Sequence, residues 1–148
     1  KWTASRAMAE YLVQMCSSTA HLPETPAGLT KQPPLVVTPK EPVKHRISAA
    51  QGLHSYGSEA AAVLGIPGAQ TDLGGGLTVA MVRFAARYEY ACTVEDVLAR
   101  RSRMLFLDAR KAIALAPAVA DVLREELRAD PRLDAFLTLA QQYLHVPA

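Results

Sequence analysis

Apolar residues recur every three or four positions along most of the chain, which is the spacing of one face of an α-helix. The first such stretch covers residues 5–20. Its apolar stripe consists of Ala4, Met8, Leu12 and Met15. Thr3 is expected to cap the first turn, because its hydroxyl can accept a hydrogen bond from an unpaired amide there. We therefore predict a first helix over residues 5–20.

Prolines interrupt regular structure in the next part of the chain. They are Pro23, Pro26, Pro33, Pro34, Pro39 and Pro42. Each proline lacks an amide donor and favours extended geometry in the residue before it. Proline-rich chains act as semi-rigid spacers. We predict a linker over residues 22–45, between a helix within 1–21 and a second unit over 46–148.

The second unit has the pattern of several helices. The predicted ranges are 46–55, 58–64, about 77–90, 94 to about 115, 117–129 and a last helix after Asp130. Thr93 and Asp96 have the spacing of a capping box, in which a hydroxyl and a carboxylate satisfy each other's backbone amides. Pro117 suits the first turn of a helix, and Asp130 with Pro131 repeats that arrangement. The last helix is expected to turn Leu133, Phe136, Leu137, Ala140 and Leu144 inward.

No convincing alternation of a β-strand accompanies these helices. The prediction is an all-α fold, a compact bundle of six or seven helices preceded by the proline-rich linker. With 148 residues, half of them hydrophobic, the chain is long enough for one domain with a sizeable core.

Composition excludes several classes of protein. The 16 basic and 14 acidic residues are too evenly balanced for a nucleic-acid-binding protein. Cys16 and Cys92 have no metal-binding spacing and make no disulfide framework, so we expect small core residues in a reducing compartment. No apolar run is long enough to span a bilayer. The start at Lys1-Trp2-Thr3, without an initiator Met, leads us to expect a piece of a longer protein.

Two motifs that invite a chemical interpretation are better explained by structure. Gly74-Gly75-Gly76 lacks the spacing and the lysine of a phosphate-binding loop, and we interpret it as a flexible entry to a helix. The four histidines include no pair at metal-binding spacing and no oriented acid partner, so neither a metal site nor a hydrolytic site is assigned.

Charged residues on the predicted helix 94–115 are more informative. Arg101 and Asp108 fall in the middle of its apolar stripe, and burying an unpaired ion costs several kcal/mol. They should meet partners, with Glu89 and Arg87 as candidates, or else Arg101 faces another domain or an anionic ligand. Asp96 and Arg100 form an ordinary i, i+4 surface pair. The structural ion-pair candidates are Arg87, Glu89, Asp96, Arg100, Arg101 and Asp108.

Three segments resemble one enzyme family. Residues 1–10, KWTASRAMAE, resemble the GGK-W-TTYR-x-MAE signature that closes the FAD domain of FAD-dependent glycerol-3-phosphate dehydrogenases. Residues 86–103, ARYEYACTVEDVLARRSR, are similar to the R-x-E-x-A-x-T-x-x-D-x-L-x-R-R-x-R segment of that family's C-terminal helical domain. Residues 53–60, LHSYGSEA, are similar to its L-x-x-x-Y-G-S-x-A element. With their order preserved, the resemblance to the mitochondrial type covers most of the chain.

This resemblance implies a division of the chain. Residues 1–21 would be the C-terminal helix of the FAD-binding domain, and residues 46–148 the C-terminal helical cap. The full enzyme would oxidise sn-glycerol 3-phosphate to dihydroxyacetone phosphate and pass electrons through FAD to ubiquinone. Lys1, Thr3 and Arg6 match motif positions next to flavin and substrate, whereas no catalytic residue is expected in the cap. Ala4 and Ser5 depart from the family's second Thr and its aromatic residue.

The resemblance also implies cofactors, partners and location. The G-x-G-x-x-G motif that binds a dinucleotide is absent from this sequence, so FAD is expected in the full-length enzyme and not in this piece, which we expect to be soluble, structural and inactive. The expected partners are the enzyme's own FAD-binding domain and a second copy of the chain. The expected location is the mitochondrial inner membrane of a eukaryote, bound peripherally, or the cytoplasmic membrane of a bacterium. Two alternatives stay open: a stand-alone helical interaction module, or the cap of a glycerol-3-phosphate oxidase.

Overall fold

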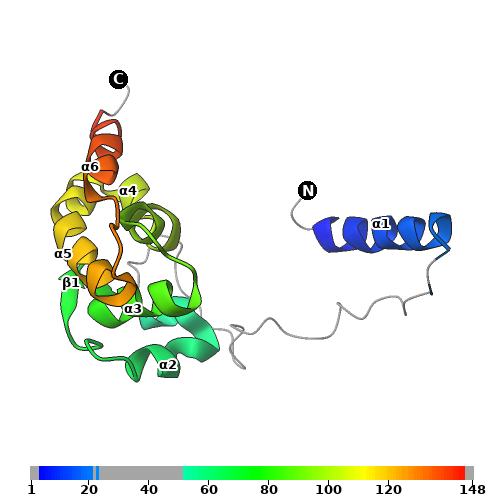
Figure 1. Ribbon diagram of the computed structural model, residues 1–148, viewed down its shortest axis with the longest axis horizontal. Helices are drawn as coiled ribbons and strands as arrows, with labels where there is room; N and C mark the ends of the chain where they lie inside the picture. Colours follow the sequence, from blue (N-terminus) through cyan, green and yellow to red (C-terminus); the bar gives the residue numbers. More distant parts are fainter. Residues whose placement is uncertain (1–3, 22, 24–51, 146–148) are drawn as a thin grey trace. The chain divides into compact units, whose positions relative to one another are not determined.

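The chain forms two compact units, Lys1–Val36 and Val37–Ala148, in the computed structural model (Figure 1). The structure describes residues 4–21, 23 and 52–145. Most of these residues are helical and the second unit is compactly packed, which confirms the predicted fold class. Within the same ranges, no helix combines the length and the apolar character that a membrane span requires.

Helix α1, Ser5–Thr19, is the helix predicted over residues 5–20. Ala4 occupies its N-cap position without a side-chain cap bond, and the predicted cap Thr3 lies outside the described residues. No residue of α1 is buried. Its large apolar side chains are 48–61% exposed, and they are Met8, Tyr11, Leu12, Val13 and Met15. A helix with this much apolar surface normally buries a face, so α1 lacks a cover among the described residues of its own unit.

The second unit contains a short antiparallel hairpin among its helices. Its elements are the 3₁₀ helix η3 (Leu53–Glu59), α2 (Ala60–Leu64), β1 (Asp72–Gly74), β2 (Leu77–Thr78), α3 (Val79–Tyr88), the π-helix η4 (Asp96–Arg101), α4 (Met104–Leu107), α5 (Ala109–Leu127) and α6 (Leu133–Gln141). Figure 1 shows α4, α5 and α6 grouped at the end of this unit that carries the C-terminus.

The hairpin was not predicted, because its two strands are too short to show alternation. β1 and β2 are connected through Gly74, Gly75 and Gly76, whose φ values of 117°, 65° and 81° lie where side chains other than glycine are strained. The glycines therefore form the turn of a hairpin, and the interpretation as a flexible helix entry is wrong. Helix α3 starts after the hairpin, where the Thr78 hydroxyl accepts from the Met81 amide at 3.3 Å.

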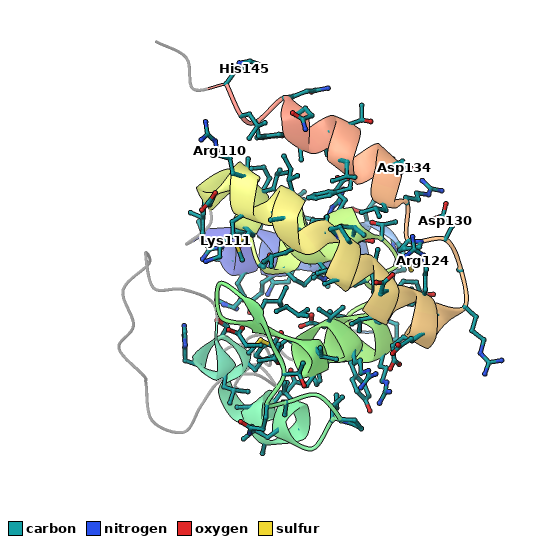
Figure 2. The ribbon with its side chains drawn as sticks, turned by 90° about the vertical axis from the view of Figure 1, so that its left-hand side faces the viewer. Arg110, Lys111, Arg124, Asp130, Asp134 and His145 are labelled. Atoms are coloured by element: carbon teal, nitrogen blue, oxygen red, sulfur yellow. The ribbon has the colours of Figure 1, made fainter. Side chains whose placement is uncertain are left out.

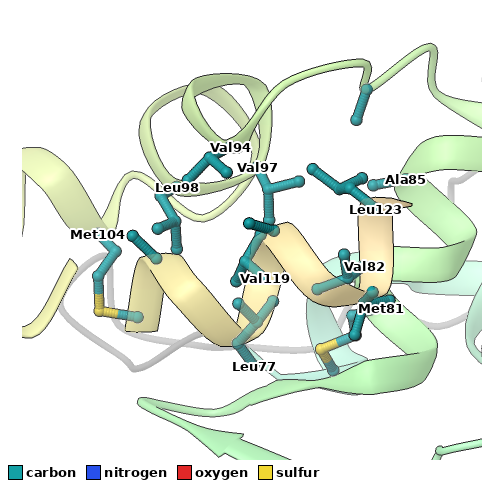
Figure 3. Packing of buried hydrophobic residues seen from close by; sticks show 14 of the residues in the cluster. Leu77, Met81, Val82, Ala85, Val94, Val97, Leu98, Met104, Val119 and Leu123 are labelled. Atoms are coloured by element: carbon teal, nitrogen blue, oxygen red, sulfur yellow. The ribbon is translucent and has the colours of Figure 1, made fainter. Parts of the chain in front are cut away.

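The core of the second unit lies between α3, η4 and α5. Figure 3 shows Met81 and Val82 of α3 facing Val119 and Leu123 of α5, and Leu98 packing from η4. All five side chains are at most 2% exposed. Full burial of one such side chain contributes on the order of 1.5–3 kcal/mol, so this core is the main source of the unit's stability.

The continuous helix predicted over residues 94–115 is wrong. The chain forms six residues of π-helix in η4, then breaks at Ser102 and Arg103 before α4 begins. The buried Ser102 hydroxyl donates to the Leu98 carbonyl at 3.2 Å and accepts from the Met104 amide at 3.3 Å, so it supplies the bonds that the helix loses at the break. A sequence pattern of period 3.6 does not distinguish this broken path from one straight helix.

The prolines of the last two helices also differ from the prediction. Pro117 lies inside α5 and does not begin a new helix. Helix α6 begins at Leu133, after Arg132 in the left-handed conformation, and the Asp130 carboxylate accepts from the Arg132 amide instead of capping the helix. The inward face is confirmed for four residues, since Phe136 and Ala140 are buried while Leu133 and Leu137 pack against the core. Leu144 lies beyond the end of α6 and is only part-buried, so its place on that face is corrected.

The two cysteines contradict the prediction that they are core residues. Cys16 and Cys92 are both free and exposed. Cys16 lies on α1, which buries nothing, and Cys92 lies in the connection that precedes η4.

Candidate functional site

The residues expected next to flavin and substrate lie at the beginning of the chain. Lys1 and Thr3 are outside the described residues. Arg6 is on α1, where its guanidinium forms an ion pair with the Glu10 carboxylate at 2.9 Å. The pair is of the i, i+4 kind, and with Arg6 39% exposed it contributes at most a few tenths of a kcal/mol.

The capping box at the start of η4 is present as predicted. The Thr93 hydroxyl accepts from the Asp96 amide at 3.1 Å, and the Asp96 carboxylate accepts from the Thr93 amide at 3.0 Å. The same carboxylate accepts from the Cys92 amide at 3.1 Å and from the Thr93 hydroxyl at 2.8 Å. Burial acts to raise the pKa of Asp96, but these bonds and the charge of Arg100 outweigh it and hold the pKa below its ordinary value.

Arg100 lies on the solvent side of this cluster. Its guanidinium contacts the Glu95 carboxylate at 2.7 Å and the Asp96 carboxylate at 3.1 Å. Arg100 is 55% exposed, so these ion pairs are screened by solvent and contribute little stability.

Arg101 lies on the inner side of η4, as its place in the apolar stripe suggested. Its guanidinium donates to the backbone carbonyl of Glu89 and lies 3.9 Å from the Glu89 carboxylate and 3.8 Å from the Asp96 carboxylate. Burial raises the pKa of Glu89, the charge of Arg101 opposes the shift, and one Glu89 oxygen, Oε2, has no hydrogen-bond donor. Arg101 thus ties the end of α3 to η4, mainly through the backbone.

Asp108 does not occupy the position expected for it. Because the helix breaks before it, Asp108 is exposed, and its carboxylate caps α5 by accepting from the Lys111 amide at 3.0 Å. Among the described residues it forms no ion pair with Arg101, so its assignment to the core-facing stripe is corrected.

Arg87 belongs to a second cluster, between α3 and α5. It donates from two nitrogens to the two Glu126 oxygens, each at 2.7 Å. Arg83 contacts Glu125 at 2.9 Å and Glu126 at 3.1 Å, and it also donates to the Pro67 carbonyl at 2.8 Å. The hydrogen bonds from Arg87 hold the pKa of Glu126 below its ordinary value, against the effect of burial.

Sequence reasoning missed Glu125 and Glu126, which are about forty positions away from these arginines. A local signal existed on each side: Arg83 and Arg87 are one turn apart on α3, and two adjacent acids end the polar face of α5. Nothing in the sequence connected the two helices.

A small pocket lies beside the capping box. It has a volume of about 260 Å³ and is lined by Thr93, Glu95, Asp96, Arg100, Arg132, Ala135 and Phe136. Its acids are already engaged with Arg100 and with backbone amides. The described residues hold no group of His, Cys, Asp or Glu suited to a metal ion. The charged side chains of these two clusters and Asp108 join helices or cap them.

The glycine turn does not fit the phosphates of a flavin cofactor. A dinucleotide-binding loop joins a strand to a helix and points free amides at the phosphates. Here the loop joins two strands of a hairpin, and the Gly74 amide donates to the Asp72 carboxylate at 2.9 Å. A carboxylate in that place would repel a phosphate.

The fold and these contacts define a helical domain held together by its core and by interhelical ion pairs. Comparison with known proteins then identifies the family. The model for the C-terminal domain of alpha-glycerophosphate oxidase matches residues 43–133. The chain belongs to this family of C-terminal domains of FAD-dependent glycerol-3-phosphate dehydrogenases and oxidases.

Curated relatives carry consistent names. The chain is 31% identical, over 97% of its length, to a probable mitochondrial glycerol-3-phosphate dehydrogenase of Dictyostelium discoideum, and the match covers 25% of that relative. Over 33% of its length it is 47% identical to a mitochondrial glycerol-3-phosphate dehydrogenase of Schizosaccharomyces pombe, covering 8% of that protein. A probable mitochondrial glycerol-3-phosphate dehydrogenase of Caenorhabditis elegans is 50% identical over 32% of the chain, which is 6% of the relative. No solved structure matches the chain.

Proposed function

We propose that this chain is the cap of a flavoenzyme that oxidises sn-glycerol 3-phosphate to dihydroxyacetone phosphate. The observation that carries the proposal is the family match over residues 43–133, together with relatives named as glycerol-3-phosphate dehydrogenases. The chain spans about a quarter of the length of the Dictyostelium relative, so the proposal assigns the reaction to the whole enzyme and not to the cap.

The proposal assigns a role to each part of the chain. Residues 1–21 would be the last helix of the FAD-binding domain, residues 22–45 a linker, and residues 46–148 the cap. The exposure of every large apolar side chain of α1 supports this division, because such a helix needs a cover that a larger neighbouring domain would supply. By resemblance to the family signature, Lys1, Thr3 and Arg6 would lie near flavin and substrate.

The role proposed for the cap itself is structural. The acids of both charged clusters are paired with arginines or with backbone amides, which suits joining helices better than reacting with a substrate. We expect the isolated chain to bind no FAD, since its glycine turn is unsuited to phosphate. A flavin absorbance band in the purified chain would contradict this part of the proposal.

The electron acceptor distinguishes two versions of the enzyme. In the first, two electrons from the C2 alcohol pass through FAD to ubiquinone at a mitochondrial or bacterial membrane, which the dehydrogenase names of the relatives favour. In the second they pass to oxygen, which the family description as an oxidase favours. We prefer the first, because all three relatives are named as dehydrogenases.

The test is an assay of the full-length gene product that contains this chain. We expect it to carry FAD and to reduce a soluble quinone analogue when sn-glycerol 3-phosphate is added, faster than it produces hydrogen peroxide from oxygen. Glycerol 1-phosphate, the mirror-image substrate, is the matched control and should react at least tenfold more slowly. A flavin-loaded product that oxidises neither compound would contradict the proposed function, and faster peroxide production would favour the oxidase.

A further inference from the structure

Helix α4 carries apolar side chains on all of its sides. Met104 and Leu105 are buried in the core, at 7% and 2% exposure. Phe106 and Leu107 point the other way and are 60% and 70% exposed. A helix that is apolar all round is normally buried all round. The exposed side chains of α4, Phe106 and Leu107, are therefore of the kind that is normally buried against another surface.

A third side chain extends this surface. Tyr143, just after α6, is 44% exposed, and its ring packs edge-on against Phe106 with the ring centroids 5.6 Å apart. Phe106, Leu107 and Tyr143 thus form one apolar patch from two elements far apart in sequence, which we call the α4 corner. Adjacent exposed aromatic and aliphatic side chains are uncommon on a surface that faces water alone.

The α4 corner is held in place by the backbone around it. Ser102 bridges the end of η4 and the start of α4, and Asp108 caps the start of α5 immediately after α4. Arg103 begins α4 with φ at 55°, a left-handed conformation that costs about 1–2 kcal/mol for a residue other than glycine. A surface fixed in this way loses little conformational freedom when it binds.

Charged residues flank α4 in the sequence, with Arg103 before it and Asp108, Arg110 and Lys111 after it. Arg103, Arg110 and Lys111 are exposed, and no ion pair joins any of them to an acid among the described residues. Figure 2 shows Arg110 and Lys111 near the start of α5, at the same end of the unit as His145 after α6. Phenylalanine, tyrosine and arginine together are the residue types enriched where proteins bind one another.

We propose that the α4 corner is the surface through which the cap docks on the flavin-binding body of the same enzyme. This inference rests on the proposed function. The body is the favoured occupant because the match leaves three quarters of the Dictyostelium relative outside it, enough chain for a large domain next to the cap.

The test is side-chain footprinting by hydroxyl radicals, read by mass spectrometry. The oxidation rates of Phe106, Leu107 and Tyr143 are compared between the 148-residue chain and the full-length gene product. We expect each rate to fall at least threefold in the full-length protein. Tyr90, which is 89% exposed in the connection between α3 and η4, is the internal control and should not change. Equal rates at the α4 corner in both proteins would overturn the inference.

A pair of variants tests the energetic contribution of the corner. Phe106→Gln with Leu107→Gln should leave the melting temperature of the 148-residue chain within about 2 °C, because both side chains are already exposed there. The same double variant should lower the melting temperature of the full-length protein by at least 5 °C, whereas Tyr90→Asn should lower neither. No difference between the double variant and Tyr90→Asn in the full-length protein would overturn the inference.

Other occupants give different results. If the double variant instead abolishes self-association of the chain, seen by light scattering, a second copy covers the corner and the inference is wrong. The inference is also wrong if the α4 corner binds phosphatidylserine vesicles and its side chains are oxidised as fast in the full-length protein as in the 148-residue chain. FAD content and glycerol 3-phosphate oxidation of the unmodified full-length protein test the proposed function separately. An active enzyme with an unprotected corner would contradict the docking surface alone.

Discussion

Helix α1 and helix α5 have similar apolar content but opposite environments. α1 buries none of its residues, whereas α5 buries six, among them Val119 and Leu123 at 0% exposure. The difference comes from the neighbouring elements. Helix α5 packs against α3, α4 and α6, whereas no described residue of the first unit covers α1. The second unit thus has a core of its own, and we propose that a larger neighbouring domain covers the apolar side chains of α1.

The largest effect on the free energy of unfolding is expected from a core residue of the second unit, and almost none from a residue of α1. Phe136→Ala removes a ring that is 1% exposed and should lower the free energy of unfolding by about 3–5 kcal/mol. Leu12→Ala, on the exposed face of α1, should change it by less than about 0.5 kcal/mol. Urea denaturation followed by circular dichroism at 222 nm measures both. A cost above 2 kcal/mol for Leu12→Ala would mean that α1 is packed in the isolated chain.

The capping box should give the next largest effect. Asp96→Ala removes the acceptor of four donors, two backbone amides, the Thr93 hydroxyl and the Arg100 guanidinium, and should cost about 1–2 kcal/mol in the same urea experiment. Asp134→Ala, at an exposed acid in the first turn of α6, is the matched control and should cost less than about 0.5 kcal/mol. Equal costs would show that the bonds of Asp96 add nothing beyond a favourable charge.

The pH dependence of the Asp96 contribution follows from its lowered pKa. An acid whose pKa is lower in the folded state stabilises the fold above its unfolded pKa and loses this contribution as the pH falls through the folded value. Asp96→Asn should therefore reduce the loss of stability on acidification below about pH 4, the ordinary aspartate pKa. An unchanged acid limb of the stability curve would contradict the assignment.

A smaller effect is expected from the ion pairs between α3 and α5. Glu126→Gln weakens two charged hydrogen bonds from the part-exposed Arg87 and should cost about 1 kcal/mol. Glu125→Gln, at a carboxylate 65% exposed, should cost about half of that or less. Because salt screens exposed charges, the difference between the two variants should shrink in 1 M sodium chloride. A difference that is insensitive to salt would point to packing instead.

The smallest effect, and of opposite sign, concerns Glu89. Burial raises its pKa, so its ionisation costs stability as the pH rises from the ordinary glutamate value through the raised one. Glu89→Gln should be neutral or stabilising by less than about 0.5 kcal/mol at pH 7 and should flatten the curve in that range. A clear destabilisation at pH 7 would show that the contact with Arg101 outweighs the burial cost.

Much of the fold was predictable because local signals dominated it. The apolar stripes located α1, α3 and α6, and the threonine–aspartate spacing located the capping box correctly. The break at Ser102 and Arg103 was missed because it depends on a serine bonding to backbone groups on both sides, which no periodicity reveals. The partners of Arg83 and Arg87 were missed because tertiary packing, and not sequence distance, brings Glu126 to them.

The assignment of α1 to the flavin-binding body is tested most directly by hydrogen exchange along the chain. In the 148-residue chain, the amides of α1 should exchange within about tenfold of the unstructured rate, since an isolated helix of 15 residues is marginal in water. Buried amides of α5 should be slowed at least a thousandfold. In the full-length gene product, α1 should become as protected as α5. Strong protection of α1 in the isolated chain, or none in the full-length protein, would contradict this account.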